Sequence, residues 1–383
     1  MRQGFTLTEL LVATAVFFVI LAVVLQLTDR TSKIWRNATS KIQAFQEARA
    51  GFDSATRNLA QATLNTYYDY YDGSNPPVAR TALTTRAQLA SFSPATYDRV
   101  SDLHFICGQA STLLSASTGI TTQTQAIFFQ APKGYSISYQ EVDNALNACG
   151  YFLQFDDGAS AVPDFIKNAP GYQRRYRFRM MEMTQSTEEL GIYQNATTAP
   201  NDWFVKNALA NSRPIAENVI ALVFLPKLSD RQDDPNGGAA GVSLAPNYNY
   251  NTRIPLKATS DPSWAGANPP FPPDAFTAYP TGGGTTSATR HHQLPPIVRM
   301  IMIVIDEASA ARLTSSTPGK PPTAIDLSKT TLFTDATKLD ADIAAVEDIC
   351  NAKAGNLTGN TVKLTYRVFS TDIIMRQAKW SSK

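Results

Sequence analysis

An uninterrupted apolar run near the start of the chain constrains the fold more than any other feature. Residues 10–25 contain no charged side chain, and Thr14 is the only polar residue among them. Extending the run to residues 5–27 gives 23 residues with a single charge, Glu9. A helix of that length is roughly 34 Å long, whereas the hydrocarbon core of a membrane is about 30 Å thick. The sequence therefore predicts a transmembrane helix over residues 5–27.

Two ordinary kinds of segment compete for this interpretation. A cleaved secretory signal needs a small-residue site after its apolar run, and this run ends in Gln-Leu-Thr-Asp instead. The second kind is a plain signal anchor, and the length of the apolar run fits one. Neither accounts for a carboxylate in the first turns, because a carboxylate inside lipid costs about 2.5–3.5 kcal/mol and needs a partner.

A third interpretation rests on the residues Gly-Phe-Thr-Leu-Thr-Glu at positions 4–9. Followed by the apolar run, they resemble the N-terminal signature of type IV prepilins and type II secretion pseudopilins. The resemblance implies that prepilin peptidase removes a leader, residues 1–4, by cutting after Gly4, and that the new N-terminal Phe5 is methylated. It also implies that Glu9 pairs with the Phe5 amine of a neighbouring subunit.

The charges beside the apolar run bear on its orientation. Arg2 is the only charged side chain before the run, whereas Arg30, Lys33 and Arg36 follow it together with Asp29. The positive-inside rule alone would place the body of the chain in the cytoplasm. The resemblance implies the opposite: a single-pass protein of a bacterial inner membrane whose head lies in the periplasm or on a filament at the cell surface.

The apolar pattern continues beyond the membrane as an amphipathic helix over residues 28–66. Residues 28–64 contain no proline. Their apolar positions, mostly three or four residues apart, are Ile34, Ala38, Ile42, Phe45, Phe52, Ala55 and Leu59. We expect this stripe to pack on a head. Residues 48–62 resemble the corresponding helix of J-type minor pseudopilins and W-type minor pilins, and the tyrosines and prolines after residue 66 are expected to end the helix.

The head, residues 67–230 and 297–383, is predicted to be rich in mainly antiparallel strands, which gives an α+β, pilin-like fold. The predicted strands are 103–107, 126–130, 151–155, 175–183, 219–225, 297–305, 362–369 and 373–376, with helices over 306–313 and 335–350. In the fourth strand Arg175, Arg177 and Arg179 alternate with apolar residues. A solvated strand face is the expected role of these arginines, and a binding patch is the alternative.

Residues 231–296 differ from the rest of the head. They hold 11 of the 23 prolines and 7 of the 20 glycines, so we expect a surface insertion or loop that forms no ladder. Asp230, Asp233 and Asp234 lie at its start. Carboxylates suit calcium, which some of the pseudopilins that this chain resembles bind in their heads, but the spacing fits no complete calcium loop. An acidic turn is the simpler interpretation.

Three cysteines, Cys107, Cys149 and Cys350, form neither a metal-binding pattern nor a disulfide framework. In an oxidising compartment one pair could close, and Cys107 with Cys149 is the candidate because both border predicted strands. Three buried thiols are the alternative. The net charge of +2, from 34 basic and 32 acidic residues, indicates no nucleic-acid partner.

Three segments of the body carry a second resemblance. Residues 217–229, 294–313 and 366–380 are similar to the family named Verru_Chthon cassette protein C, whose members carry the same prepilin-type N-terminus. The resemblance implies kinship with pilin-like proteins and no known activity.

The sequence offers little for an enzyme. It has no nucleophile elbow, zinc-protease helix, P-loop or dinucleotide fingerprint. His104 falls in a predicted strand, and His291 and His292 fall in the Pro/Gly-rich segment. We therefore expect a non-enzymatic minor filament subunit whose partners are prepilin peptidase, other pilin or pseudopilin subunits and membrane lipid. The alternative is a membrane-anchored extracytoplasmic binding module that does not polymerise.

Overall fold

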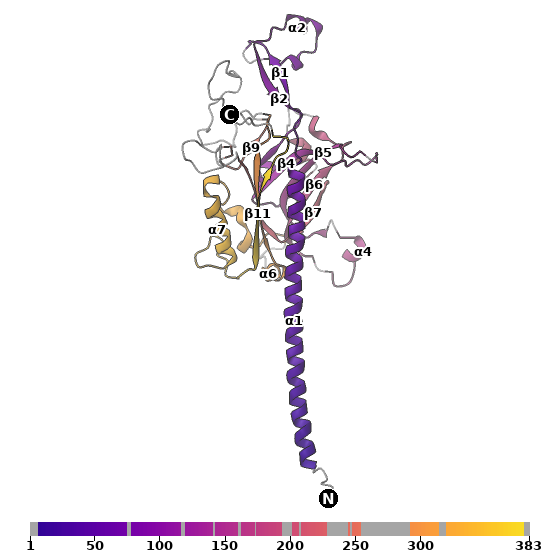
Figure 1. The fold of residues 1–383 in the computed structure, drawn as a ribbon, viewed down its shortest axis with the longest axis vertical. Coiled ribbons are helices and arrows are strands. Elements are labelled where there is room, and N and C mark those ends of the chain that lie inside the picture. The colour runs from indigo at the N-terminus through magenta and orange to yellow at the C-terminus, as the bar shows by residue number, and fades with distance from the viewer. Residues whose placement is uncertain are drawn as a thin grey trace.

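The computed structural model joins one long helix to a head of mixed helices and sheets (Figure 1). It describes residues 7–74, 78–115, 119–140, 142–159, 162–172, 174–193, 201–206, 208–227, 244–245, 247–253, 292–313 and 319–378. The free end of the helix projects far from the head, and the other end is built into it (Figure 1). The fold class is α+β, as predicted.

Helix α1 runs without a break over Leu7–Leu59, which is 53 residues and about 80 Å. It ends before the predicted boundary at residue 66, and the tyrosines that were expected to end it form strand β1, Tyr67–Tyr71. The apolar stripe is also shorter than predicted: Ile34 and Ile42 are exposed, and continuous burial begins near Ala48. The head therefore covers only the last part of α1.

The larger sheet has six antiparallel strands in the order β7-β6-β5-β4-β3-β9. Their bounds are β3 Ile106–Gln109, β4 Gln125–Pro132, β5 Leu146–Asp156, β6 Arg177–Gln185, β7 Ser212–Glu217 and β9 Tyr250–Asn251. The four central strands were predicted, with shifted ends. The two edge strands, β7 and β9, were not.

The smaller sheet has three antiparallel strands in the order β11-β10-β8. They are β8 Val219–Lys227, β10 Ile297–Ile305 and β11 Tyr366–Ile374. The bounds of β10 are those predicted from its nearly unbroken apolar run, which only Arg299 interrupts. The predicted strands 362–369 and 373–376 are a single strand, because the polar residues between them pair with β10 in unbroken register.

The two sheets face each other across one apolar core, and each has a second core on its outer face. The inner core joins Phe105 and Phe129 of the larger sheet to Phe224 and Met302 of the smaller one, and α1 adds Phe52 and its neighbours. Short helices complete the outer cores. They are α3 Ala110–Leu113 and α5 Asp202–Val205 on the larger sheet, and α6 Glu307–Arg312 and α7 Leu339–Cys350 on the smaller one. The predicted helices near 306–313 and 335–350 are thus confirmed.

The remaining described elements lie around this sandwich. Strand β1 pairs with β2, Thr96–Val100, and with α2, Arg86–Ser91, forms a projection at the end opposite the free end of α1 (Figure 1). Helix α4, Asp164–Lys167, lies at one side. Short 3-10 turns span Arg80–Ala82, Gly191–Tyr193, Thr323–Ile325, Leu327–Lys329 and Ala336–Lys338.

The prediction that residues 231–296 form no ladder is wrong in its described part. Strand β9 lies in this segment and pairs with β3, with Tyr248 and Tyr250 fully buried. Burial of these aromatic side chains stabilises the strand, although the surrounding prolines and glycines disfavour strand formation. Most of the segment, 231–243 and 254–291, lies outside the described residues.

Helix α1 lies close against the head at Gly51. A Cβ at this position would lie 2.8 Å from the carbonyl oxygen of Ile215 in β7 and 3.3 Å from the Ala216 side chain. The neighbouring Phe52 ring packs 5.8 Å from Phe369 of β11, centroid to centroid. Glycine therefore allows α1 to lie against the backbone of β7 while the next side chain enters the core.

We predict that Gly51→Leu lowers the free energy of unfolding by about 1–3 kcal/mol, because a rigid β-strand backbone cannot move aside for the new side chain. Thermal unfolding of the full chain in detergent measures the effect. Ala50→Leu is the matched control, because Ala50 is exposed on the same turn and should change stability by less than about 0.5 kcal/mol. Equal unfolding temperatures for the two variants would contradict the close packing.

Candidate functional site

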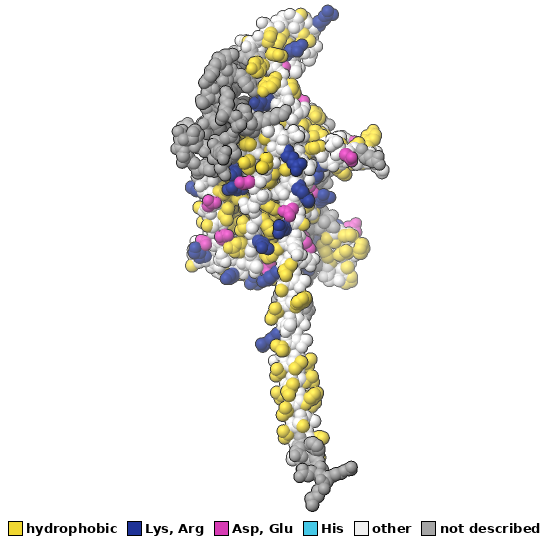
Figure 2. All heavy atoms as spheres, in the orientation of Figure 1, with side chains coloured by type: hydrophobic (Ala, Val, Ile, Leu, Met, Phe, Trp, Pro, Cys, Tyr) yellow, Lys and Arg dark blue, Asp and Glu magenta, His cyan; other side chains and the backbone are white. Residues whose placement is uncertain are grey.

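The projecting half of α1 exposes a long run of large hydrophobic side chains. Within the segment Leu10–Trp35 the most apolar stretch of 18 residues has a mean hydropathy of 2.8, and none of the segment is buried against the head. Figure 2 shows hydrophobic side chains covering this half, with cationic side chains nearer the head. At about 1.5 Å per residue it is long enough to cross a bilayer. The chain thus has one N-terminal helix that could serve as a membrane anchor.

The hydroxyl groups of this segment are compatible with lipid. Thr14 donates to the Leu11 carbonyl at 3.0 Å, Thr28 to Val24 at 2.9 Å and Thr31 to Leu27 at 2.8 Å. A hydroxyl that donates to a carbonyl of the preceding turn leaves no unpaired donor to be desolvated. These threonines therefore add little polarity to the helix surface.

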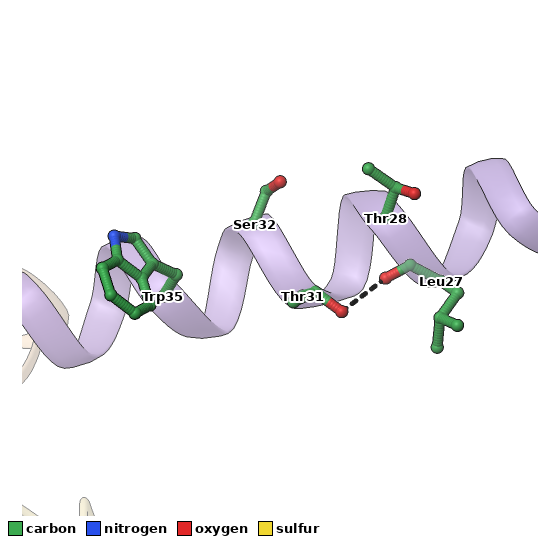
Figure 3. Close-up of a pocket in the computed structure, with 5 residues that line it drawn as sticks. All are labelled: Leu27, Thr28, Thr31, Ser32 and Trp35. Carbon is green, nitrogen blue, oxygen red and sulfur yellow. Dashed lines mark hydrogen bonds between the residues drawn. The ribbon is translucent and has the colours of Figure 1, made fainter.

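The apolar segment ends on a mixed surface. Leu27, Thr28, Thr31, Ser32 and Trp35 line a shallow groove along one side of α1, with the threonine-to-carbonyl bond lying along it (Figure 3). Trp35 is 73% exposed, and Lys33 pairs with Asp29 at 2.7 Å one turn earlier. Tryptophan and charged side chains of this kind suit the boundary between hydrocarbon and water.

Of the predicted processing and pairing residues, Gly4 and Phe5 fall outside the described residues. The backbone of Glu9 lies in the first turn of α1. Residue 9 is therefore at the far end of the apolar segment from the head.

A buried carboxylate attaches the other end of α1 to the head. Glu182 of β6 is 2% exposed. Its Oε1 accepts hydrogen bonds from Asn58 of α1 at 3.0 Å, from Tyr151 of β5 at 3.0 Å and from Lys133 at 2.9 Å. Its Oε2 accepts two from the Arg213 guanidinium, at 3.0 and 2.7 Å. One side chain thus connects the helix to three neighbouring parts of the larger sheet.

The charges in this cluster outweigh the effect of burial. Burial by itself would raise the pKa of the Glu182 carboxyl, but hydrogen bonds and positive charge from Lys133 and Arg213 hold that pKa below its ordinary value. Burial and the Glu182 charge raise the pKa of Tyr151 well above the usual range, so Tyr151 remains a neutral donor. The cluster is therefore one carboxylate held by two cations and two neutral donors.

Sequence analysis missed Glu182, although the strand carried a signal. Residues 178, 180 and 182 fall on the same face of β6, where Phe178 and Met180 are buried. A glutamate at the next position of an inward-facing series must be buried with partners. Its partners come from distant parts of the chain and could not be read from the local pattern.

We predict that Glu182→Gln destabilises the head by about 1–3 kcal/mol at pH 7, because the amide accepts fewer charged hydrogen bonds. Since the native pKa lies below the unfolded value of about 4.3, the stabilisation is present above that pH and is lost as pH falls through the native pKa. Chemical unfolding at pH 7 and pH 3 should therefore show a smaller difference between wild type and variant at pH 3.

The exposed Glu189→Gln is the matched control, with little effect at either pH. A Glu182→Gln deficit of the same size at both pH values would show that the charge of Glu182 does not stabilise the fold.

The predicted disulfide between Cys107 and Cys149 is wrong in this structure, where all three cysteines are buried free thiols. Cys107 lies on β3 and Cys149 on β5, with β4 between them. Two strand spacings separate the residues by about 10 Å, beyond the roughly 7 Å limit between Cα atoms of a disulfide. Burial raises the pKa of the Cys149 and Cys350 thiols to about 12, which makes them unreactive.

Arg177 and Arg179 of β6 form neither the solvated strand face nor the binding patch that the sequence predicted. Arg179 is 4% exposed, bonded to Asp156 and, at 3.0 Å, to Glu217. Arg177 is half-buried and pairs with Glu307 of α6 at 3.0 Å. Paired in this way, these two side chains hold neighbouring elements together. The expectation of a solvated face is wrong for Arg177 and Arg179, because acidic residues from other elements pair with them, whereas Arg175 lies before β6 and is exposed.

The histidine and acid side chains of the described residues form no metal site. His104 is fully buried, its Nδ1 accepting from Trp203 at 3.2 Å and its Nε2 lying 2.8 Å from the Asn251 side-chain oxygen. Among the described residues no group of three or more His, Cys, Asp or Glu side chains could hold a metal ion. His291 and the calcium candidates Asp230, Asp233 and Asp234 lie outside the described residues.

Comparison with known proteins adds no relative. No family model, no curated protein and no solved structure matches this chain.

Proposed function

We propose that this chain is a non-enzymatic minor subunit of a type IV pilus-like or type II secretion-like filament. The observation that carries the proposal is the division of α1, which exposes an uncharged, mainly apolar surface over residues 10–27 and then enters the core of a large α+β head. The projecting half of α1 can leave the lipid and pack among other helices without disturbing the head. Residues 48–62 resemble the corresponding helix of J-type and W-type minor subunits, which favours a minor subunit of that type.

The N-terminal signature supplies the route to assembly. In this proposal prepilin peptidase removes residues 1–4, Phe5 becomes the methylated N-terminus, and the head lies outside a bacterial inner membrane. The apolar half of α1 then packs among the helices of neighbouring pilin or pseudopilin subunits. Helix association in lipid gains little from the hydrophobic effect, so close packing and polar pairing must supply the energy and the register.

Glu9 is the residue that makes assembly specific in this proposal. A lone carboxylate in the hydrocarbon core costs about 2.5–3.5 kcal/mol, and an isolated terminal amine is also penalised. Pairing Glu9 with the Phe5 amine of the next subunit removes both penalties at once. The pair also fixes the axial stagger of adjacent helices, because only one alignment brings the two charges together.

We predict that Glu9→Val remains inserted in the membrane but co-assembles with partner subunits at least tenfold less well, since tenfold corresponds to about 1.4 kcal/mol. Recovery of partner subunits with the full chain, from sheared filaments or solubilised membranes, measures this. Thr14→Val is the matched control within the same apolar segment and should assemble normally. Wild-type recovery with Glu9→Val would exclude the pairing mechanism.

Replacing residues 1–27 by an unrelated transmembrane helix separates this proposal from the anchored binding module. Residues 28–59 stay unchanged, because their C-terminal part belongs to the head core. We predict that the chimera inserts and folds but no longer co-assembles, since the packing surface and Glu9 are gone. Partner recovery equal to wild type would favour a head that works from any anchor.

A further inference from the structure

Strand β11 forms one edge of the three-stranded sheet, and no strand of the described residues pairs with its outer side. It pairs with β10 over nine residues in unbroken antiparallel register. It contains no proline, no glycine and no bulge, which are the usual devices that prevent further strands from adding to an edge. A long, regular edge of this kind is a template for another strand.

The register identifies the backbone groups on the open side. The Asp306 N–H donates to the Thr365 carbonyl, and the Met375 N–H donates to the Pro296 carbonyl, both at 3.0 Å. Because hydrogen-bonded residues alternate in an antiparallel ladder, the even-numbered residues of β11 point their N–H and C=O groups away from β10. These residues are Tyr366, Val368, Ser370, Asp372 and Ile374. In the described part of the chain, none of these groups has a hydrogen-bond partner.

The other edges of the two larger sheets are blocked. The outer edge of β8 is capped by side chains of the larger sheet, since Thr124 and Gln125 accept from the backbone N–H groups of Leu222 and Phe224. Strand β7 contains Pro214 and a register shift, and β9 has only two residues. Among the described edges of these sheets, β11 alone is long and unblocked.

We propose that β11 is a docking site for an extended, acidic segment of a partner protein, which adds as a fourth strand to the three-stranded sheet. This mode of recognition uses main-chain hydrogen bonds for affinity and alternate side chains for specificity. The proposal goes beyond filament assembly through α1, and it does not depend on Glu9 or on processing of the N-terminus.

Antiparallel pairing of β11 with a second copy of itself is incompatible with a shared membrane. Helix α1 and β11 run side by side in the same direction, because three contacts follow one another in the same order along both elements. Lys41 donates to the Thr365 hydroxyl at 3.5 Å, and Phe52 packs on Phe369. Beyond the end of each element, the Arg376 N–H donates to the Ala60 carbonyl at 3.3 Å. A two-fold axis that pairs two β11 strands antiparallel would point the two α1 helices in opposite directions. A partner segment carries no such restriction.

The charge around the edge indicates the chemistry of that segment. Lys363, Arg367 and Arg376 lie on or beside β11, and all three side chains are exposed. The single acid of the strand, Asp372, is already held by Arg299 at 2.7 and 2.9 Å and by Lys227 at 3.2 Å. The open edge is therefore cationic, and carboxylates on an added strand would complement it.

The test uses the full chain in detergent and two synthetic nine-residue peptides, one alternating valine with glutamate and the other valine with lysine. We expect the glutamate peptide to bind at least tenfold more tightly. It should slow hydrogen exchange at the amides of Val368, Ser370 and Asp372 at least tenfold. The amides of Phe369 and Thr371 already bond to β10 and should change little.

Three variants keep the test specific. Ser370→Pro removes an outward N–H without breaking a bond to β10 and should abolish peptide binding, whereas Ser370→Ala keeps the N–H and should bind as wild type. Arg367→Glu should reduce the preference for the glutamate peptide at least tenfold in a chain whose edge amides are intact.

Each contrary result overturns the proposal. Equal binding of the two peptides would exclude the acidic partner. Binding of neither peptide, or unchanged binding by Ser370→Pro, would exclude strand addition at this edge. Edge amides that are already protected without peptide, in a sample that sediments as a dimer, would identify a second copy as the occupant.

Discussion

The packing of the last three turns of α1 into the head is the contact on which the rest of the structure depends. The same helix has to present apolar side chains outward over Leu10–Trp35 and inward from Ala48 onward. Gly51 allows the helix to reach the backbone of β7, and Phe52 then fills the space beside β11. Because no break separates the two halves, the position of the projecting rod is fixed by how the head holds its other end.

A polar cluster complements this apolar contact. Apolar packing alone tolerates small rotations of a helix, whereas the hydrogen bonds that converge on Glu182 require Asn58 to face one point on the sheet. Buried carboxylates are costly unless every oxygen is satisfied, and this one accepts from four side chains. The cluster therefore sets the rotation of α1, and with it the side of the rod that faces away from the head.

The sequence predicted the parts of the fold whose pattern is local. The nearly unbroken apolar run of β10 predicted its bounds, and the apolar run of α1 predicted a membrane-length helix. Strands β7 and β9 were not predicted, because pairing with neighbouring strands and not their own composition makes them strands. Strand β7 contains Pro214, and β9 lies in a Pro-rich segment. The alternation of Tyr248 and Tyr250 with asparagines was the available signal for β9.

Features that depend on distant contacts were not predictable in this way. Ile34 and Ile42 fit the apolar stripe but lie exposed, because the stripe does not say how far the head extends along the helix. Arg179 followed the alternation of an exposed strand face, yet Asp156 and Glu217 from neighbouring strands enclose it. The Glu182 cluster likewise brings together residues from five parts of the chain.

The central claim is that the chain enters an assembly through a processed N-terminus on an apolar rod. The most direct measurement is the intact mass and N-terminal sequence of the mature protein isolated from its native membrane. The account predicts a chain that begins at Phe5, lacks Met1 to Gly4 and carries one methyl group on the Phe5 amine. A mature protein that still begins with Met1 and has an unmodified amine would contradict the filament-subunit account and leave a head on a simple membrane anchor.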